Sequence, residues 1–155
     1  DFNHAVIEMF IIARQAGYNV RGVNDLLNYS GPVEPHTRQH VDPFQQIQLK
    51  LNNHERTNFN IPIIFMRHEI PRMYHTKIPN KHIYNYSFAL HPECNYPSGS
   101  CNSSHIDNSI LKFVFPSVDP DTNNSVRWEG NIDIFARNWN IFKIAAGMGA
   151  VRYCN

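Results

Sequence analysis

Residues 91–110, HPECNYPSGSCNSSHIDNSI, concentrate the side-chain types that most often perform chemistry in proteins. Two thiols and two imidazoles in this stretch make up the donor set of a Cys2His2 zinc site: His91, Cys94, Cys101 and His105. Their spacing disfavours such a site, because no Cys-x-x-Cys pair occurs and a turn-like Pro-Ser-Gly sequence separates the two cysteines. A zinc-dependent enzyme is therefore a minor alternative, and we predict no bound metal or other cofactor.

The same stretch contains the residue types of a nucleophilic triad, Ser104, His105 and Asp107. We expect Ser104 and His105 to be neighbours on one strand, where consecutive side chains point to opposite faces and cannot meet as nucleophile and base. Cys94 could act as a nucleophile with a distant histidine, but nothing around it in the sequence favours a thiolate. The sequence thus predicts that the protein is not an enzyme, and that this stretch is a turn-rich connection between two strands.

Two other groups of residues suggest binding rather than catalysis. The sequence HTRQH at 36–40 is bracketed by prolines and lacks the glutamate of a metalloprotease motif, so we expect a surface loop. Four aromatic residues would form a sugar-binding platform if they were exposed: Tyr84, Tyr86, Trp128 and Trp139. Aromatic residues on strands more often belong to the core, so a carbohydrate-binding β-sandwich is kept as an alternative function.

The composition is that of one globular domain. The chain has 155 residues, of which 42% are hydrophobic and 17% charged, with a formal net charge of +1. This balance provides no basic patch for nucleic acid, so no direct nucleic-acid partner is expected. The longest apolar run, residues 9–13, is far shorter than the ~20 residues of a membrane span, so no membrane insertion is expected. Three cysteines are too few for a disulfide framework and favour a reducing compartment.

A continuous β-branched and aromatic run predicts a buried strand at 5–14. Alternating apolar residues predict strands at 44–51, 81–90, 105–115 and from 131 onward, where a bend at 147–149 precedes a last short strand. Residues 59–70 contain Pro62, which removes a ladder donor, so an edge strand or a bend is expected there. Turn-forming residues dominate 15–43, apart from a short helical turn at 24–27, and they recur at 118–125. Since no segment shows a sustained helical period, the sequence predicts an all-β antiparallel sandwich or barrel.

The period of two also assigns faces to these strands. The strand at 44–51 should have one wet face that carries Gln46, Gln48 and Lys50. The residues expected to share a face on the later strands are Tyr84, Tyr86, Phe88 and Leu90, then Leu111, Phe113 and Phe115, then Ile132, Ile134 and Ala136.

Four sequence motifs in a fixed order resemble the major capsid protein of nucleocytoplasmic large DNA viruses. They are LNNHER at 51–56, HTKIPNKHIYNYSFALHPE at 75–93, PSGSCNSSHIDN at 97–108 and the closing FARNWNIFKIAAGMGAVRYCN. The residues that carry the resemblance are Leu51, Asn52, His54, Arg56, His75, Ile78, Pro79, Tyr86, Ser87, Phe88, Pro97, Ser98, Gly99, Asn102, Ser104, Ile106, Asp107, Asn108, Asn140, Gly147 and Gly149. Any one motif alone would be weak evidence, whereas four in order are specific.

The resemblance implies a double jelly-roll protein that trimerises into pseudo-hexagonal capsomers of an icosahedral shell. Residues 1–155 are then expected to be a single domain, most of the second, C-terminal jelly roll, without its first strand or strands. The implied partners are two further copies in a homotrimer, neighbouring capsomers and minor capsid proteins. The implied location is the virion capsid, assembled in the host cytoplasm. A sandwich that lacks strands exposes apolar surface, so the isolated chain is expected to be poorly soluble or to associate.

The resemblance also gives the polar stretch at 97–108 an architectural role. We expect the side chains of Asp107 and Asn108 to accept hydrogen bonds from neighbouring backbone donors, as Asx side chains do near turns, and so to fix the start of the following strand.

Overall fold

The computed structural model describes residues 4–16, 29, 41–57, 61–116 and 129–152. Its elements, in chain order, are β1 (Ala5–Gln15), β2 (Gln46–Leu51), β3 (His54–Glu55), η1 (Phe65–Glu69), α1 (Ile70–Tyr74), β4 (Ile83–Ser87), β5 (Cys101–Asn102), η2 (Ser103–His105), β6 (Ser109–Val114), β7 (Gly130–Asn138), β8 (Phe142–Ala145) and β9 (Met148–Val151). The helical turn expected at 24–27, the loop at 36–40, the turn at 118–125 and Trp128 lie outside the described residues.

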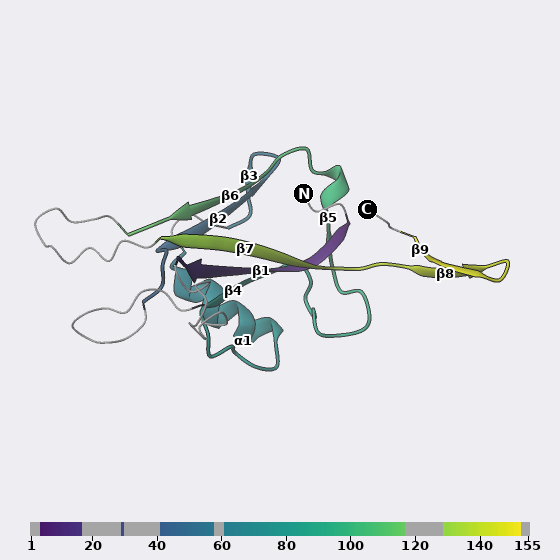
Figure 1. Ribbon diagram of the computed structural model, residues 1–155, viewed down its shortest axis with the longest axis horizontal. Coiled ribbons are helices and arrows are strands. Elements are labelled where there is room, and N and C mark those ends of the chain that lie inside the picture. The colour runs from purple at the N-terminus through teal and green to yellow at the C-terminus, as the bar shows by residue number, and fades with distance from the viewer. Residues whose placement is uncertain (1–3, 17–28, 30–40, 58–60, 117–128, 153–155) are drawn as a thin grey trace, which may run out of the picture.

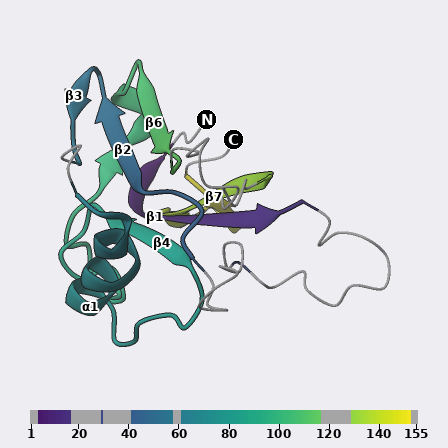
Figure 2. The same ribbon diagram turned by 90° about the vertical axis from the view of Figure 1, so that its left-hand side faces the viewer.

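Two antiparallel sheets face each other, and β1 is the central strand of the larger one (Figure 1). One edge of β1 pairs with β4 and β5, and the other edge pairs with β7 along nearly its whole length. The smaller sheet has the order β3-β2-β6, with Leu49 opposite Leu111. Viewed from the side, its strands run across the direction of β1 (Figure 2). The predicted all-β antiparallel sandwich is therefore confirmed.

The apolar side chains between the sheets form the core. Strand β1 contributes Val6 and Met9, which are three residues apart and would point to opposite faces of a regular strand. The pairing of β1 with β7 shifts register between Val6 and Glu8, and this irregularity brings both side chains to the same face. Beyond it the inward phase continues with Ile11 and Ala13, which are fully buried.

Residues 63–70 of the segment predicted as an edge strand or a bend are helical, so that prediction is wrong there. Ile63, Met66 and Ile70 are spaced by three and four residues, which places them on one side of a helix, and all three are buried in the core. The η1 turn is a π-helix in which the Ile70 N–H donates to the Phe65 carbonyl. Pro71, which follows, has no N–H to continue a regular ladder. The helix packs beside β4 and closes one end of the sandwich (Figure 1).

Strand boundaries and faces differ from the predictions in three places. Gln48 is buried, so β2 lacks the fully wet face expected of it. β4 ends at Ser87 rather than at residue 90, and Leu90 is exposed. β6 begins at Ser109, because residues 103–105 form the short helix η2 instead of a strand. The faces predicted for β6 and β7 are confirmed for Leu111 and Phe113 and for Ile132 and Ala136, which join the core clusters.

Candidate functional site

The Leu-Asn-Asn-His motif forms the tight turn between β2 and β3. Asn52 and Asn53 have φ angles of +49° and +64°, a region that asparagine tolerates better than most residues with a side chain. The Asn52 N–H donates to the Asn108 carbonyl at 2.7 Å, and the Asn108 N–H donates back to Asn52 Oδ1 at 3.1 Å. This reciprocal pair fastens the turn to the start of β6. The Asx acceptor is thus the Asn52 side chain, and not Asp107 or Asn108 as expected.

The rest of this motif secures the return strand. The Arg56 N–H donates to the Leu49 carbonyl at 2.8 Å, and the Leu49 N–H donates to Thr57 Oγ1 at 2.7 Å. Leu51 is buried in the core, whereas His54 and Arg56 are exposed. Only backbone groups and one buried hydroxyl are used here, so the motif fixes a hairpin and offers no reactive group.

The carboxylate of Glu8 on β1 is buried and contacts side chains from three other segments. Its side chain is 1% exposed. Asn85 Nδ2 donates to Glu8 Oε2 at 3.2 Å, and Arg137 Nη1 donates to Glu8 Oε1 at 3.4 Å. His75 Nε2 lies 3.0 Å from Glu8 Oε2, without the alignment of a hydrogen bond. Because a buried carboxylate is stable only when it is paired, these contacts connect β1, β4, β7 and the end of α1.

His75, the first residue of the second motif, also contacts Glu93 on the surface. Its Nδ1 atom lies 3.2 Å from Glu93 Oε1. Glu93 accepts hydrogen bonds from the Thr76 N–H at 3.1 Å and from the Thr76 hydroxyl. The bond from the Thr76 hydroxyl is the main reason that the pKa of Glu93 lies below its ordinary value. The loop at 88–101 is thereby attached to the end of α1.

Ile78 and Pro79 of the second motif line a small depression of about 340 Å³ on the surface. Arg67, Lys81 and His82 also line it, and Arg67 forms an ion pair with Asp42 at 3.0 Å.

The aromatic residues of the second motif pack into the core. The Tyr86 and Phe88 rings meet edge to face, with centroids 5.0 Å apart. Burial raises the pKa of Tyr86. Ser87 Oγ accepts from the Ala89 N–H at 3.2 Å and donates to the Ala89 carbonyl at 2.6 Å, which turns the chain at the end of β4.

Tyr84 cannot belong to an exposed sugar-binding platform, because its side chain is fully buried. Its hydroxyl donates to Asp42 Oδ1 at 2.7 Å, and burial together with this neighbouring carboxylate strongly raises the pKa of Tyr84. Tyr86 and Trp139 are half-buried. Among the aromatic residues that the structure describes, the proposed platform is therefore not present.

The Pro-Ser-Gly turn holds the loop at 88–101 against the end of β4. The His91 N–H donates to Ser98 Oγ at 2.8 Å, and the Leu90 N–H approaches the Ser98 carbonyl at 3.4 Å. Gly99 has a φ of +142°, and a Cβ at this position would lie 2.7 Å from the Phe88 carbonyl oxygen. Only glycine fits here, for both reasons. Pro97 precedes the turn at an exposed position.

The residues proposed for catalysis lie on η2 and the turn that follows it. Asn102 Oδ1 caps η2 by accepting from the Ser104 N–H at 3.2 Å, and Ile106 packs into the core. Asp107 is exposed. Residues 103–105 form a helix, so the strand expected to carry Ser104 and His105 is wrong. Ser104 and His105 are successive exposed residues of this short helix.

The proposed zinc ligands also remain apart. Within the described ranges, no three His, Cys, Asp or Glu side chains gather closely enough to hold a metal ion. Cys94 and Cys101 are both free thiols, and burial raises the pKa of Cys101, which disfavours the thiolate.

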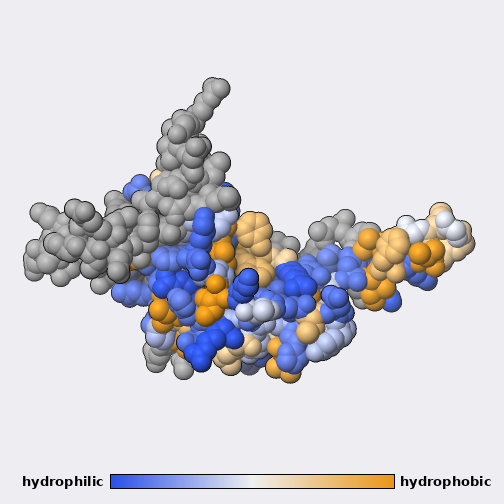
Figure 3. All heavy atoms as spheres, turned by 90° about the horizontal axis from the view of Figure 1, so that it is seen from below, coloured by the Kyte–Doolittle hydropathy of each residue, from blue (hydrophilic) through white to orange (hydrophobic). Residues whose placement is uncertain are grey.

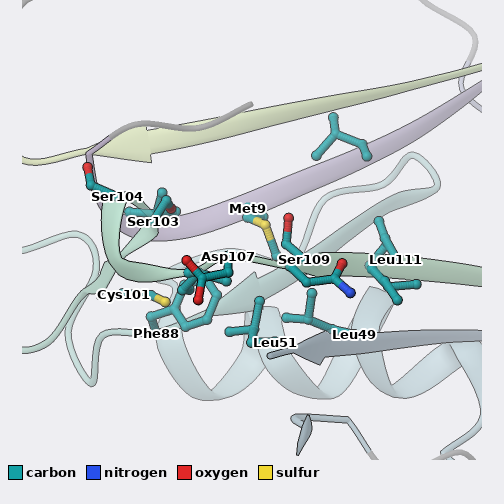
Figure 4. A pocket seen from close by; sticks show the side chains of 15 residues that line it. Met9, Leu49, Leu51, Phe88, Cys101, Ser103, Ser104, Asp107, Ser109 and Leu111 are labelled. Carbon is teal, nitrogen blue, oxygen red and sulfur yellow. The ribbon is translucent and has the colours of Figure 1, made fainter. Parts of the chain in front are cut away.

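An open groove of about 530 Å³ lies between the two sheets (Figure 4). Met9, Leu49, Leu51 and Phe88 form its apolar floor, and Ser103, Asp107 and Ser109 are among the polar residues at its rim. A single carboxylate beside an apolar floor provides no acid and base pair. The groove is suited to apolar side chains rather than to a reaction.

The last motif forms a hairpin. Ala146 and Gly147 have φ angles of +53° and +76°, as a two-residue turn with both central residues in the left-handed region requires. Gly149 leaves room for the Phe142 ring, since a Cβ there would lie 2.7 Å from Phe142 Cζ. Asn140 Oδ1 accepts from the Ile141 N–H at 2.8 Å just before β8. The predicted last short strand is confirmed, whereas the bend lies at Ala146 and Gly147 instead of 147–149, since Met148 and Gly149 already belong to β9.

Comparisons with known proteins agree with this architecture. The chain is 34% identical over 114 residues to the major capsid protein of Chrysochromulina ericina virus, an alignment that covers 74% of this chain and 19% of that protein. It is 40% identical over 85 residues to the major capsid protein of Phaeocystis pouchetii virus, which covers 55% and 16%. The aligned region is thus less than a fifth of the length of either relative.

Solved structures show the same fold. A chain of the PBCV-1 virus capsid superposes with a TM-score of 0.77 at 20% identity, over 100% of this chain and 45% of that one. The Faustovirus major capsid protein gives a TM-score of 0.61 at 14% identity, over 87% of this chain and 30% of that one. The relatives are structural capsid proteins rather than enzymes, as predicted. The sequence also matches the family described as large eukaryotic DNA virus major capsid protein over residues 1–150, and the chain belongs to that family.

Proposed function

We propose that the complete protein forms the shell of a virion as a homotrimer, a pseudo-hexagonal capsomer that tiles an icosahedral capsid. The observation that carries this proposal is the family match over residues 1–150. The site contacts support it, because the motif residues fasten turns and strand ends, as at Asn52 and Asn108, instead of assembling a reactive centre. A rigid sandwich with fixed loops is what a repeating shell subunit requires.

Residues 1–155 are proposed to be a single domain, most of the C-terminal jelly roll of the subunit. Two facing antiparallel sheets support this assignment. Within the described residues β6 pairs only with β2, and β7 pairs only with β1, so each has one edge to which a further strand could add. Strands supplied from elsewhere in a longer capsid protein would cover the open groove between them.

The proposed partners are neighbouring capsomers and minor capsid proteins, with no direct contact to nucleic acid. The net charge of +1 supports the last point. No helix in the described part of the chain is both long and apolar enough to cross a membrane. Assembly is proposed to take place in the host cytoplasm, before the subunit becomes part of the virion capsid.

The proposal is tested by measuring the particle mass, in solution, of the protein encoded by the complete open reading frame that contains this sequence. Light scattering is expected to give three subunits per particle, and negative-stain images are expected to show a hexagonal outline. A monomer at the same concentration would contradict the proposal.

A further inference from the structure

The positive charge of the protein is concentrated in one segment, residues 67–82. This segment contains four Arg or Lys residues, three His residues and a single Glu, so its formal charge is +3 with His neutral, whereas the whole chain carries only +1. It comprises part of η1, all of α1 and the loop that leads to β4. The side of the body on which α1 lies is mainly hydrophilic (Figure 3). A surface region of this charge attracts anionic ligands.

Basic side chains from both ends of this segment meet at the surface depression of about 340 Å³. Those that line it are Arg67 and His68 from η1, and Lys81 and His82 from the loop before β4. None of the described residues that line it is acidic. The fold therefore collects, around one hollow, charges that are separated along the chain.

Arg67 is fixed in position and still has a donor to offer. Its Nη1 atom donates to Asp42 Oδ1 at 3.0 Å, and its side chain is only 16% exposed. Its Nε atom is buried and has no hydrogen-bond partner among the described residues. A buried donor without an acceptor costs free energy, and an oxyanion in the depression can supply that acceptor. The planar guanidinium matches the geometry of phosphate oxygens.

Asp42 balances only part of the positive charge at the depression. Its carboxylate pairs with Arg67 and lies 3.7 Å from His82 Nδ1. The ammonium of Lys81 adds a second full charge, and its Nζ atom lies 5.6 Å from the centre of the Tyr29 ring. A cation–π contact of this kind positions the ammonium without neutralising it. The depression thus keeps a net positive charge even when both of its histidines are neutral.

The other lining residues indicate what the anion is attached to. Ile78 and Pro79 place apolar surface beside the basic groups, and Ile78 is 38% exposed. Apolar surface next to an anion site suits the carbon skeleton of an organic ester. Nucleic acid fits less well, because it is bound by basic residues spread along several phosphates. The volume of the depression is near the lower end for small-molecule sites, enough for one charged group and part of the molecule that bears it.

We propose that the depression binds the phosphate or sulfate group of a small organic ester. Arg67 and Lys81 hold the oxyanion, and Ile78 and Pro79 contact the carbon skeleton. A soluble sugar ester and a phospholipid headgroup are two sources of the same chemistry. The inference does not depend on the proposed capsomer, since all of these residues belong to one subunit.

The test is isothermal titration calorimetry of the protein encoded by the complete open reading frame, with glucose 6-phosphate, glucose 6-sulfate and neutral glucose at one ionic strength. Both esters are expected to bind, and neutral glucose is not. Lys81→Gln is expected to weaken the binding of both esters about fivefold. Lys77→Gln, exposed on the same loop but outside the depression, is the matched control and should change it by less than about twofold. Equal affinities of the two variants, or no binding of either ester, would overturn the inference.

A second variant, Arg67→Lys, keeps the charge beside Asp42 but loses the Nε donor and the planar fork. It is expected to weaken ester binding about tenfold, and circular dichroism verifies that it is folded. An unchanged affinity would overturn the assignment of the guanidinium to the oxyanion.

Flotation with phosphatidylcholine vesicles, with and without phosphatidylinositol phosphate, separates the two sources of the ligand. Co-flotation that requires the phosphorylated lipid and is lost in Lys81→Gln assigns the depression to a lipid headgroup. Binding of the free esters without co-flotation assigns it to a soluble ligand.

Discussion

Replacing Glu8 with alanine is expected to destabilise the protein more than any exposed charge substitution. The substitution removes a carboxylate that is 1% exposed and leaves Asn85 buried without its acceptor. Removing one partner of a buried ion pair costs about 3–5 kcal/mol. Arg137 is 44% exposed and regains water, so we expect a loss of about 2–3 kcal/mol. For a chain of this length that corresponds to a fall in Tm of roughly 5–10 °C.

Differential scanning fluorimetry of the unmodified chain and its variants measures this effect. The matched control is Glu55→Ala, which removes an exposed ion pair with Lys50 at 3.1 Å and should cost at most about 1 kcal/mol. Glu8→Gln keeps an acceptor for Asn85 but loses the charge, so its Tm should lie between those of the other two variants. Equal Tm values for Glu8→Ala and Glu55→Ala would refute the reasoning that the buried carboxylate holds these segments together.

Four further substitutions test the contacts of the motifs. Asn52→Ala should lower the free energy of unfolding in urea by about 1–2 kcal/mol, because it removes a hydrogen bond and places alanine at a positive φ. Asp107→Ala should change that free energy by less than about 0.5 kcal/mol. A larger loss for Asp107→Ala than for Asn52→Ala would contradict the assignment of Asn52 as the acceptor. Gly99→Ala should cost at least about 2 kcal/mol, because its Cβ would meet a backbone carbonyl, and an unchanged unfolding midpoint would disprove that clash. The pKa of Glu93 is lowered in the folded state, so this carboxylate stabilises the protein above its ordinary pKa of 4.5, and the stabilisation is lost as the pH falls through the folded pKa. Thr76→Val should reduce the dependence of Tm on pH in thermal melts between about pH 3 and 7. An identical dependence in the variant and the unmodified protein would contradict this role of Thr76.

The sandwich was predictable because period-two patterns record which face of a strand is buried. Alternation predicts that Leu111 shares a face with Phe113, and Ile132 with Ala136, and all four side chains pack against the core clusters. Alternation carries this information only where a strand is regular. The register shift near Val6 could not be read from the sequence, since the residues on both sides of Glu8, at 5–7 and 9–12, are all apolar and do not alternate.

Residues 62–70, which include η1 and the start of α1, contain two conflicting sequence signals, a proline that disfavours regular structure and an apolar spacing that favours a helix. The apolar residues Ile63, Met66 and Ile70 repeat at helical intervals, and that signal was present in the sequence. Proline is compatible with the beginning of a helix, where no N–H bond is lost, so Pro62 was consistent with either outcome. Burial of the three apolar side chains against the core decided it.

The contacts between motifs could not be predicted, because they join residues that are far apart in the chain. Glu8 and Arg137 are separated by 129 positions, and nothing local marks either as the partner of the other. The acceptor role of Asn52 is equally unmarked in the sequence, because the Asn108 N–H that it accepts from lies 56 positions away. Single-chain patterns identify turns and faces, whereas pairing of distant polar groups depends on the fold itself.

A cryo-electron microscopy map of the assembled protein, expressed from the complete open reading frame, tests the central claim most directly. We expect a threefold particle in which each subunit contains two sandwiches, one of them built from the β4-β1-β7 and β3-β2-β6 sheets. A particle without threefold symmetry, or a subunit in which these two sheets do not face each other, would contradict it.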